Sequence, residues 1–284
     1  MKKTIISIGL CLCFAFVATA QDESVSYPAL VNKQGVYILP EQGDFALGID
    51  ALPILNLFGG RGNFDQYQIY GKYFLGDNSA LRVKLRVGVN NDADKYAVQN
   101  DQAVYANPLD VDATVIDVHN YSNNNVNLSI GYEMRRGHGR VQGFFGGELN
   151  LGLSTGKEKF EYANPITELN PTPSSYYWWA YDNTRPTEYK HGNTYSAGLG
   201  LFVGAEYFIA PKLSIGAELS LAFMFYKEDM GEITQEFWNT TNNKLDTRTR
   251  RENSSPWYST NPWREHNVGF NTKPGGSVYF MFHF

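Results

Sequence analysis

Apolar and polar residues alternate one by one in eight segments of the chain. In the clearest of them, residues 79–90, five aliphatic side chains share one face, while Arg82, Lys84 and Arg86 lie on the other. A period of two over several residues predicts a β-strand. The eight predicted strands lie near residues 45–51, 67–73, 81–89, 126–134, 141–151, 195–207, 213–225 and 278–284.

Two kinds of protein fit such strands. A soluble sandwich buries its apolar face, whereas a transmembrane barrel turns that face to lipid and fills its lumen with the polar one. Three connections are tight turns, at residues 76–78, 136–139 and 210–212, and three are long loops, at residues 91–124, 153–192 and 227–265. Short turns on one side and long loops on the other are typical of outer-membrane barrels. We therefore predict an all-β fold: an eight-stranded antiparallel up-and-down transmembrane β-barrel with short periplasmic turns and long extracellular loops.

Proline residues fall at two places that such a barrel must accommodate. Pro53 follows the first predicted strand, and a closed ladder needs the N–H that proline lacks. It is expected to end that strand near the outer rim. Residues 273–276, Lys-Pro-Gly-Gly, fall within the last strand. They predict a bulge or kink there.

The N-terminus has the pattern of a secretory signal peptide. Lys2 and Lys3 begin it, an apolar stretch follows, and residues 18–20, Ala-Thr-Ala, precede the expected cleavage point. Both cysteines, Cys11 and Cys13, lie in this segment, so the exported chain is expected to have no disulfide and no thiol chemistry. The predicted organisation is a signal peptide at 1–20, a periplasmic N-terminal segment at 21–43 and an outer-membrane β-barrel at 44–284.

Composition narrows the possible partners. The chain of 284 residues has 24 Lys and Arg against 29 Asp and Glu, a formal net charge of −5. With no basic excess to neutralise phosphates, nucleic acid is excluded as a partner. Charged residues are only 19% of the chain and aromatic residues 15%, a balance that suits β-structure. Expected partners are outer-membrane lipid and lipopolysaccharide, the barrel-assembly machinery during insertion, and an outer-membrane protein or a glycan.

Three short motifs carry a resemblance. The segment Val278-Tyr279-Phe280-Met281-Phe282-His283-Phe284 resembles the C-terminal signal by which outer-membrane barrels are recognised for insertion, with Phe280, Phe282 and Phe284 as its aromatic positions. The segments at 40–50, PEQGDFALGID, and 207–216, YFIAPKLSIG, resemble those of small outer-membrane β-barrel proteins of Bacteroidetes-type bacteria, a porin-like and OmpA-barrel-like group. The resemblance implies the fold and the outer membrane, and it implies no activity.

Charged residues on the polar faces of the strands are expected to meet in the lumen. The inward positions are Asp50, Lys72, Arg82, Lys84, Arg86, Glu133, Arg135, Glu148, Glu206 and Glu218. Eight strands leave an interior just wide enough for side chains to fill, so we expect a network of paired charges. Arg82 and Glu133, near the same end of the barrel, are expected to lie close together. A narrow channel for ions or small solutes is the alternative.

All the tryptophans fall in the predicted loops: Trp178, Trp179, Trp238, Trp257 and Trp263. Aromatic faces near Asn and Arg stack on sugar rings or form hot spots for protein binding. The other interpretation is that these side chains pack on one another and stiffen long loops. We expect the loops to be the contact surface if the protein recognises a partner.

Residues suited to catalysis are few. Asp117, His119, Ser122, His191 and Ser196 lie near the predicted outer rim, where some small barrels act on lipid A, but their spacing defines no triad. No metal-binding motif is present, and no cofactor is expected. The sequence predicts a non-catalytic outer-membrane protein with a structural or surface-recognition role, extracellular loops and periplasmic termini. The alternatives are a narrow porin-like channel and, third, a lipid A-modifying enzyme.

Overall fold

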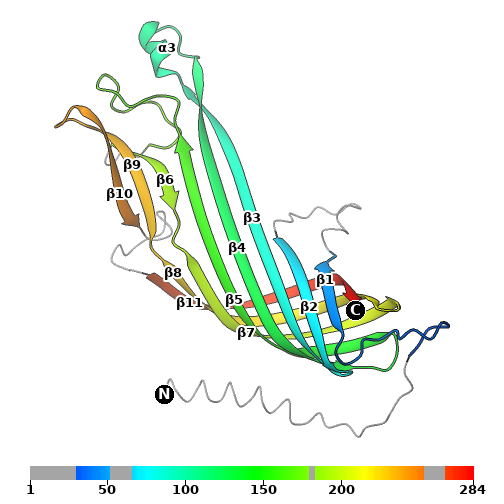
Figure 1. The fold of residues 1–284 in the computed structure, drawn as a ribbon. Helices are drawn as coiled ribbons and strands as arrows, with labels where there is room; N and C mark the ends of the chain where they lie inside the picture. Colours follow the sequence, from blue (N-terminus) through cyan, green and yellow to red (C-terminus); the bar gives the residue numbers. More distant parts are fainter. Residues whose placement is uncertain (1–29, 52–65, 179–182, 253–265) are drawn as a thin grey trace, which may run out of the picture.

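The computed structural model describes residues 30–51, 66–178, 183–252 and 266–284, which form eleven β-strands and one short helix (Figure 1). In chain order these are β1 (Phe45–Asp50), β2 (Gln66–Gly76), β3 (Ser79–Gln99), α3 (Asp101–Ala106), β4 (Thr114–Arg136), β5 (Val141–Glu161), β6 (Arg185–Lys190), β7 (Thr194–Ala210), β8 (Leu213–Asp229), β9 (Gly231–Asn239), β10 (Lys244–Glu252) and β11 (His266–His283). Among the described residues, no helix is long and apolar enough to cross a membrane.

Eight strands close into a ring in which each pair of neighbours is antiparallel. The order around the ring is β1, β2, β3, β4, β5, β7, β8 and β11, after which β11 pairs with β1. Each of these strands overlaps one of the eight segments in which the sequence alternates. The predicted all-β antiparallel architecture is confirmed. The described chain has three further strands outside the ring of eight, which the alternation did not predict.

Three short turns lie at one end of the ring, which we call the turn end. Residues 77–78 join β2 to β3, residues 137–140 join β4 to β5, and residues 211–212 join β7 to β8. Lys212 has a positive φ of 59° in its turn, and its carbonyl accepts the N–H of His283 at 2.8 Å. The segment before β1 also reaches this end, since the N–H of Lys212 donates to the carbonyl of Ile38.

Beyond the other end of the ring, the sheet continues as a projection that we call the wing (Figure 1). The wing consists of β3 from residue 90, α3, β4 up to residue 125, β5 from residue 154, and the strands β6, β9 and β10. β6 pairs with β5 and with β9, and β9 pairs with β10. The predicted long loops at 91–124, 153–192 and 227–265 therefore contain strands, which corrects the predicted loop lengths.

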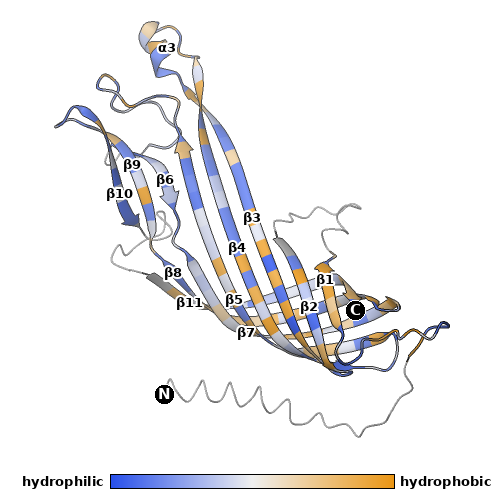
Figure 2. Cartoon of the chain, viewed as in Figure 1, coloured by the Kyte–Doolittle hydropathy of each residue, from blue (hydrophilic) through white to orange (hydrophobic). Residues whose placement is uncertain are grey.

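The wing strands lack the apolar face on which strand prediction depends. Polar residues oppose polar residues there, as in the pairs Asn91↔Ser122 and Asn120↔Lys159. Within the ring, by contrast, apolar side chains point outward and charged ones inward. Leu81 and Val83 are 45% and 43% exposed, whereas Arg82 between them is 2% exposed. Apolar residues gather on the ring and polar residues on the wing (Figure 2).

Pro274 does not interrupt β11 or its ladder with β8, so the predicted bulge is wrong there, whereas a kink stays a prediction. The ladder between β11 and β8 has no register shift along its length. Toward β1, β11 bonds through even-numbered residues such as Val278 and Phe284, and its described pairs with β1 run from Tyr279 to His283. Pro274 is even-numbered too, so the N–H that it lacks would not have bonded to β8. The ladder between β11 and β8 therefore continues through the proline.

Several predictions lie outside the described residues and stay predictions. They concern the signal peptide at 1–20, the first part of the segment at 21–43, Pro53 at the end of the first strand, and Trp179, Trp257 and Trp263. Of the five tryptophans, the structure describes Trp178 and Trp238.

Candidate functional site

Four charged side chains meet in the lumen near the turn end and form what we call the first charge cluster: Lys72 of β2, Glu133 and Arg135 of β4, and Glu206 of β7. Lys72 Nζ lies 2.9 Å from Glu133 Oε1 and 3.5 Å from Glu206 Oε2. Arg135 Nη1 lies 2.9 Å from Glu133 Oε1, and its Nη2 lies 2.7 Å from Glu206 Oε2. These side chains are at most 2% exposed, so each cation bridges two buried carboxylates.

A second charge cluster lies next to the first, farther from the turn end. It consists of Arg82 and Lys84 of β3, Glu148 of β5 and Glu218 of β8. Arg82 Nη2 lies 2.6 Å from Glu218 Oε2 and 3.8 Å from Glu148 Oε2. Lys84 Nζ lies 2.8 Å from Glu148 Oε2 and 3.2 Å from Glu218 Oε1. Arg82 Nη1 also lies 3.5 Å from Glu133 Oε2, which links the two clusters.

The two clusters together are neutral, because four cations face four carboxylates. Moving a charge out of water costs several kcal/mol unless an opposite charge and hydrogen bonds compensate it. Here each cation contacts at least two carboxylates, from strands on different sides of the lumen. The clusters therefore tie six strands of the ring together across its interior.

Glycines on inward positions make room for this packing. Gly131 lies between Arg82 and Glu148 in the strand register. A Cβ at Gly131 would lie 2.9 Å from the Cβ of Glu148 and 3.2 Å from the Cγ of Arg82, so a larger residue would push the two charges apart. Gly146 leaves room for the ring of Phe202 in the same way, since a Cβ added at Gly146 would lie 2.6 Å from Phe202 Cζ.

Aromatic rings cover the cations and fill the remaining cross-section of the lumen. The guanidinium carbon of Arg82 lies 3.8 Å from the centroid of Phe202, and Lys72 Nζ lies 4.8 Å from that of Phe144. Phe74 and Phe208 flank Arg135 at 5.3 and 5.9 Å. All four rings are buried. The half of the lumen toward the turn end is therefore packed with side chains.

Eight of the ten predicted lumen charges lie in the two clusters, and two lie elsewhere. Asp50 ends β1 and is half-buried. Arg86 lies farther from the turn end, and its Nε donates to Gln68 Oε1 at 2.9 Å. Arg82 and Glu133 were expected to lie close together, and they are 3.5 Å apart, although the shorter contact of Arg82 is to Glu218.

His283 joins the first cluster and was not among the predicted lumen residues. Its Nε2 lies 3.0 Å from Ser214 Oγ and 3.6 Å from Glu206 Oε1. Ser214 Oγ in turn donates to Glu206 Oε1 at 2.7 Å. The alternation of the last strand, with Phe282 and Phe284 outward, puts His283 on the inward face. The same alternation could have identified His283 as a lumen residue from the sequence.

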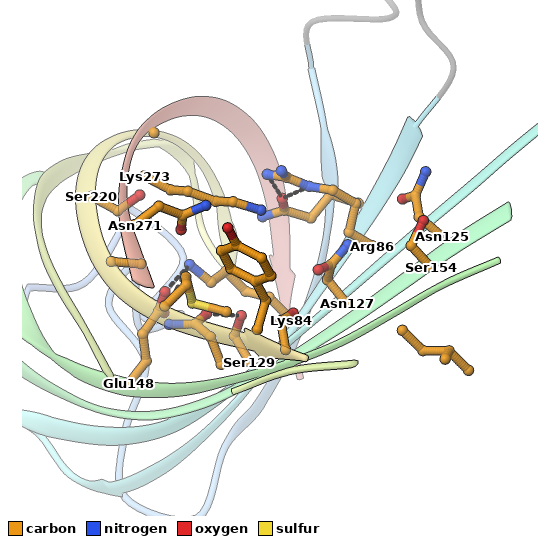
Figure 3. Close-up of a pocket in the computed structure, with 18 of the residues that line it drawn as sticks. Lys84, Arg86, Asn125, Asn127, Ser129, Glu148, Ser154, Ser220, Asn271 and Lys273 are labelled. Atoms are coloured by element: carbon orange, nitrogen blue, oxygen red, sulfur yellow. Dashed lines mark hydrogen bonds and ion pairs between the residues drawn. The ribbon is translucent and has the colours of Figure 1, made fainter. Parts of the chain in front are cut away.

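Beyond the second cluster, the lumen opens into a cavity of about 630 Å³, which we call the vestibule (Figure 3). Lys84 and Glu148 line it where it meets the second cluster, and Arg86 and Lys273 project into it from β3 and β11. Amide and hydroxyl side chains such as Asn127 make up much of the remaining lining. This half of the lumen thus has space for a polar solute.

In the wing, two buried polar side chains hold the segment that follows β5. Asp117, 2% exposed, accepts the N–H of Ala163 through Oδ1 and the N–H of Tyr176 through Oδ2, both at 2.9 Å. Asn164 donates to the carbonyls of Gln99 and Ser174 at 2.7 and 2.8 Å. Residues 162–177 are therefore anchored on β3 and β4. Asp117, considered above for catalysis, is engaged by the backbone.

An aromatic row runs along the wing from Tyr96 to His119. Tyr96 stacks on Tyr176 with ring centroids 3.3 Å apart, and Tyr176 contacts Tyr177 edge-on at 5.7 Å. Phe160 lies 5.4 Å from Tyr177 and 4.4 Å from His119. The row was not predicted from the sequence, because Tyr96, His119 and Phe160 are far apart in the chain and meet Tyr176 and Tyr177 only in the folded wing.

Of the predicted aromatic residues, Trp178 directly follows this row and Trp238 lies in β9. Both are half-buried. In the part of the chain that the structure describes, no ring contact joins Trp178 to Trp238. The observed aromatic packing involves tyrosines, Phe160 and His119 instead.

Two histidines considered for catalysis share one carboxylate. His119 Nε2 lies 2.8 Å from Glu158 Oε2, and His191 Nε2 lies 2.7 Å from Glu158 Oε1. The hydrogen bond from His191, followed by that from His119, holds the pKa of Glu158 below its usual value. Among the described residues, neither histidine hydrogen-bonds to Ser122 or Ser196, so these residues do not line up as a serine–histidine–carboxylate chain.

Replacing Glu158 with glutamine is expected to loosen the wing at neutral pH and to remove part of its pH dependence. A carboxyl group with a lowered pKa in the folded state stabilises that state above its unfolded pKa of about 4.5 and loses this effect as the pH falls through the folded value. Hydrogen exchange in the ends of β5 and β6, corrected for intrinsic rates, should be about fivefold faster in Glu158→Gln at pH 7, since a net hydrogen bond contributes about 1 kcal/mol.

The matched control is Glu168→Gln, which removes an exposed carboxylate from the segment that follows β5. It should exchange like the unmodified protein at each pH. Equal pH dependence of exchange in the Glu158→Gln variant and the unmodified protein would show that the shared carboxylate does not stabilise the wing.

Comparison with known proteins gives one family match. A family model described as the putative OmpA-OmpF-like porin family matches residues 64–236, more than half of the chain. No curated protein is found to match the sequence. The resemblance to Bacteroidetes-type barrels is narrower than the family match and stays a prediction.

Two solved structures are similar at low identity. A major outer membrane protein from Thermus thermophilus is 12% identical, with 85% of this chain and 98% of that chain covered and a TM-score of 0.36. The outer membrane protein OprG from Pseudomonas aeruginosa is 9% identical, with 87% of this chain and 98% of that chain covered and a TM-score of 0.32. At these scores, the description of the fold depends on the strand pairing of this chain alone.

Proposed function

Since this chain belongs to the putative OmpA-OmpF-like porin family, we propose that it is an integral outer-membrane β-barrel protein with a non-catalytic, structural or surface-recognition role. The apolar side chains on the outside of the ring support membrane insertion, because a lumen of buried charges inside an apolar exterior is the reverse of a soluble protein. Tyr73, Tyr132 and Tyr207 are exposed on the outside near the turn end, and Tyr195 and Phe225 near the other. Aromatic side chains of this kind anchor barrels at the two membrane interfaces.

In the proposed orientation, the turn end faces the periplasm and the wing faces outward from the cell. Short turns are the periplasmic feature of outer-membrane barrels, and longer polar extensions are the extracellular one. β3, β4 and β5 continue from the ring into the polar wing without interruption. The wing is then the part of the protein that meets other molecules.

The observation that carries the proposal is the packed lumen. The two charge clusters and their aromatic rings are neutral, buried and in mutual contact across the ring. An open diffusion pore needs a continuous water-filled path, and this packing fills the lumen near the turn end. A role at the surface therefore fits the structure better than free diffusion through the barrel.

The wing has properties suited to recognition. Asp117 and Asn164 fix the segment that carries Tyr176 and Tyr177, so Trp178, the next residue in the chain, follows a pre-ordered segment. Binding surfaces commonly rely on a few aromatic anchors held in place by their surroundings. We propose that Trp178 and Trp179, with Trp238, Trp257 and Trp263, contribute to a contact surface for a glycan or an outer-membrane protein.

A narrow channel is the second candidate, and the vestibule is the observation that favours it. About 630 Å³ of polar space already occupies half of the lumen, so a shift of the second charge cluster would extend it. This alternative predicts single-channel conductance, whereas the first proposal predicts none.

The experiment that tests the proposal has two arms. The purified protein in planar bilayers should show no regular single-channel steps, and such steps would favour the channel. In cells, Trp178→Ala with Trp179→Ala should reduce the material that co-purifies in mild detergent while leaving barrel assembly intact. Unchanged association together with faster cleavage of the wing by added protease would show that these tryptophans only pack the wing.

A further inference from the structure

Two cations that line the vestibule lie outside the two charge clusters. The four cations of the charge clusters are matched by four carboxylates. Arg86 and Lys273 lie beyond them, and in the described part of the chain neither forms an ion pair. The hydrogen bonds of Arg86 go to the neutral side chain of Gln68. The vestibule therefore carries a surplus of two positive charges.

Arg86 is held in a fixed orientation. Its Nε and Nη2 both donate to Gln68 Oε1, which leaves the other guanidinium N–H groups available. A planar guanidinium held in this way is suited to a carboxylate or phosphate group. Lys273 enters the same cavity from β11 (Figure 3).

The neutral lining offers unused hydrogen-bonding groups. Asn125 Oδ1 and Asn150 Nδ2 are buried and have no hydrogen-bond partner among the described residues. Asn150 is fixed by Ser129, whose hydroxyl donates to its Oδ1. These two atoms are covered by protein, so the amide groups that can meet a ligand hydroxyl group are those of other lining residues. Asn127 and Asn271 line the same space.

We propose that the vestibule binds a small polyhydroxylated anion, a sugar acid or a sugar phosphate. Arg86 and Lys273 bind its carboxylate or phosphate group, and Asn127 and Asn271 hydrogen-bond to its hydroxyl groups. The volume of about 630 Å³ lies within the range of small-molecule pockets, ~300–1,000 Å³. The site is separate from the wing, so it holds whether or not the wing recognises a partner.

Calorimetric titration of the full-length protein in detergent tests this proposal, with glucuronate, glucose 6-phosphate and glucose as probes. At least one of the two anions should bind, and glucose should bind at least about tenfold more weakly, since charge-assisted hydrogen bonds are stronger than neutral ones. Binding of glucuronate alone would identify a carboxylate site, and binding of glucose 6-phosphate alone a phosphate site. Binding of neither anion, or equal binding of glucose, would overturn the proposal.

Substitution assigns the binding to the vestibule. Arg86→Gln with Lys273→Gln should weaken anion binding about tenfold or more, while Lys95→Gln, which removes an exposed cation from the wing part of β3, should leave it unchanged. Lys273→Gln alone should give a smaller loss, and it serves if the double variant does not fold. Unchanged affinity in the double or single variant, or an equal loss in Lys95→Gln, would refute the assignment to this site.

Discussion

Deleting Phe280–Phe284 should abolish assembly of the ring. These residues hold four of the five pairs between β11 and β1, and Asp50↔Tyr279 alone would remain. The deletion also removes both backbone hydrogen bonds between Phe45 and Phe284. Both strands would then present unpaired N–H and C=O groups to lipid, where each costs several kcal/mol. Assembled protein, detected by its faster gel mobility before boiling, should be lost from the outer-membrane fraction.

A matched control separates strand pairing from recognition of the aromatic side chains. Replacing Phe280, Phe282 and Phe284 with valine keeps every backbone pair and an apolar outer face. If pairing closes the ring, this variant should assemble where the deletion does not. Failure of both variants would assign the effect to the aromatic insertion signal, and a deleted chain that assembles with heat-modified mobility would contradict closure between β1 and β11.

The ring could be predicted from the sequence because lipid-facing strands keep a strict alternation. Leu81, Val83 and Leu85 mark one face of β3 throughout its ring portion, and the charges between them mark the other. The alternation alone was enough to predict that most cluster members point inward. It does not specify which carboxylate each cation contacts. That Glu218 is the nearest partner of Arg82 became clear only from the structure, in which β8 faces β3 across the lumen.

The wing could not be predicted by the same means. Its strands are polar on both faces, so residues 90–99 and 114–125 read as loop. The aromatic row and the carboxylate shared by His119 and His191 join residues that are far apart in sequence. Pro274 misled the prediction of a bulge, because the residue type alone does not show toward which neighbouring strand its missing N–H would point, and the ladder with β8 continues through it.

Arg82→Leu should lower the free energy of unfolding by ~3–5 kcal/mol, the usual cost of removing one partner from a buried ion pair. The substitution leaves Lys84 to face both Glu148 and Glu218, and it removes the contact of the guanidinium with Phe202. Urea titration of the protein in lipid vesicles measures the loss. Lys95→Leu, which removes an exposed cation from the same strand, should change stability by no more than about 0.5 kcal/mol.

Two double variants test whether each charge cluster must be neutral by itself. Arg82→Leu with Glu218→Leu leaves Lys84 facing Glu148 and removes from the first cluster only the 3.5 Å contact of Glu133, so both clusters stay neutral and much of the loss should be recovered. Arg82→Leu with Glu133→Leu is neutral overall, but it leaves Lys72 and Arg135 with Glu206 alone and Lys84 with two carboxylates. It should recover less. Equal recovery in the two double variants would mean that only the total charge of the two clusters matters. Strictly additive losses of stability would mean that Arg82 is not coupled to either carboxylate.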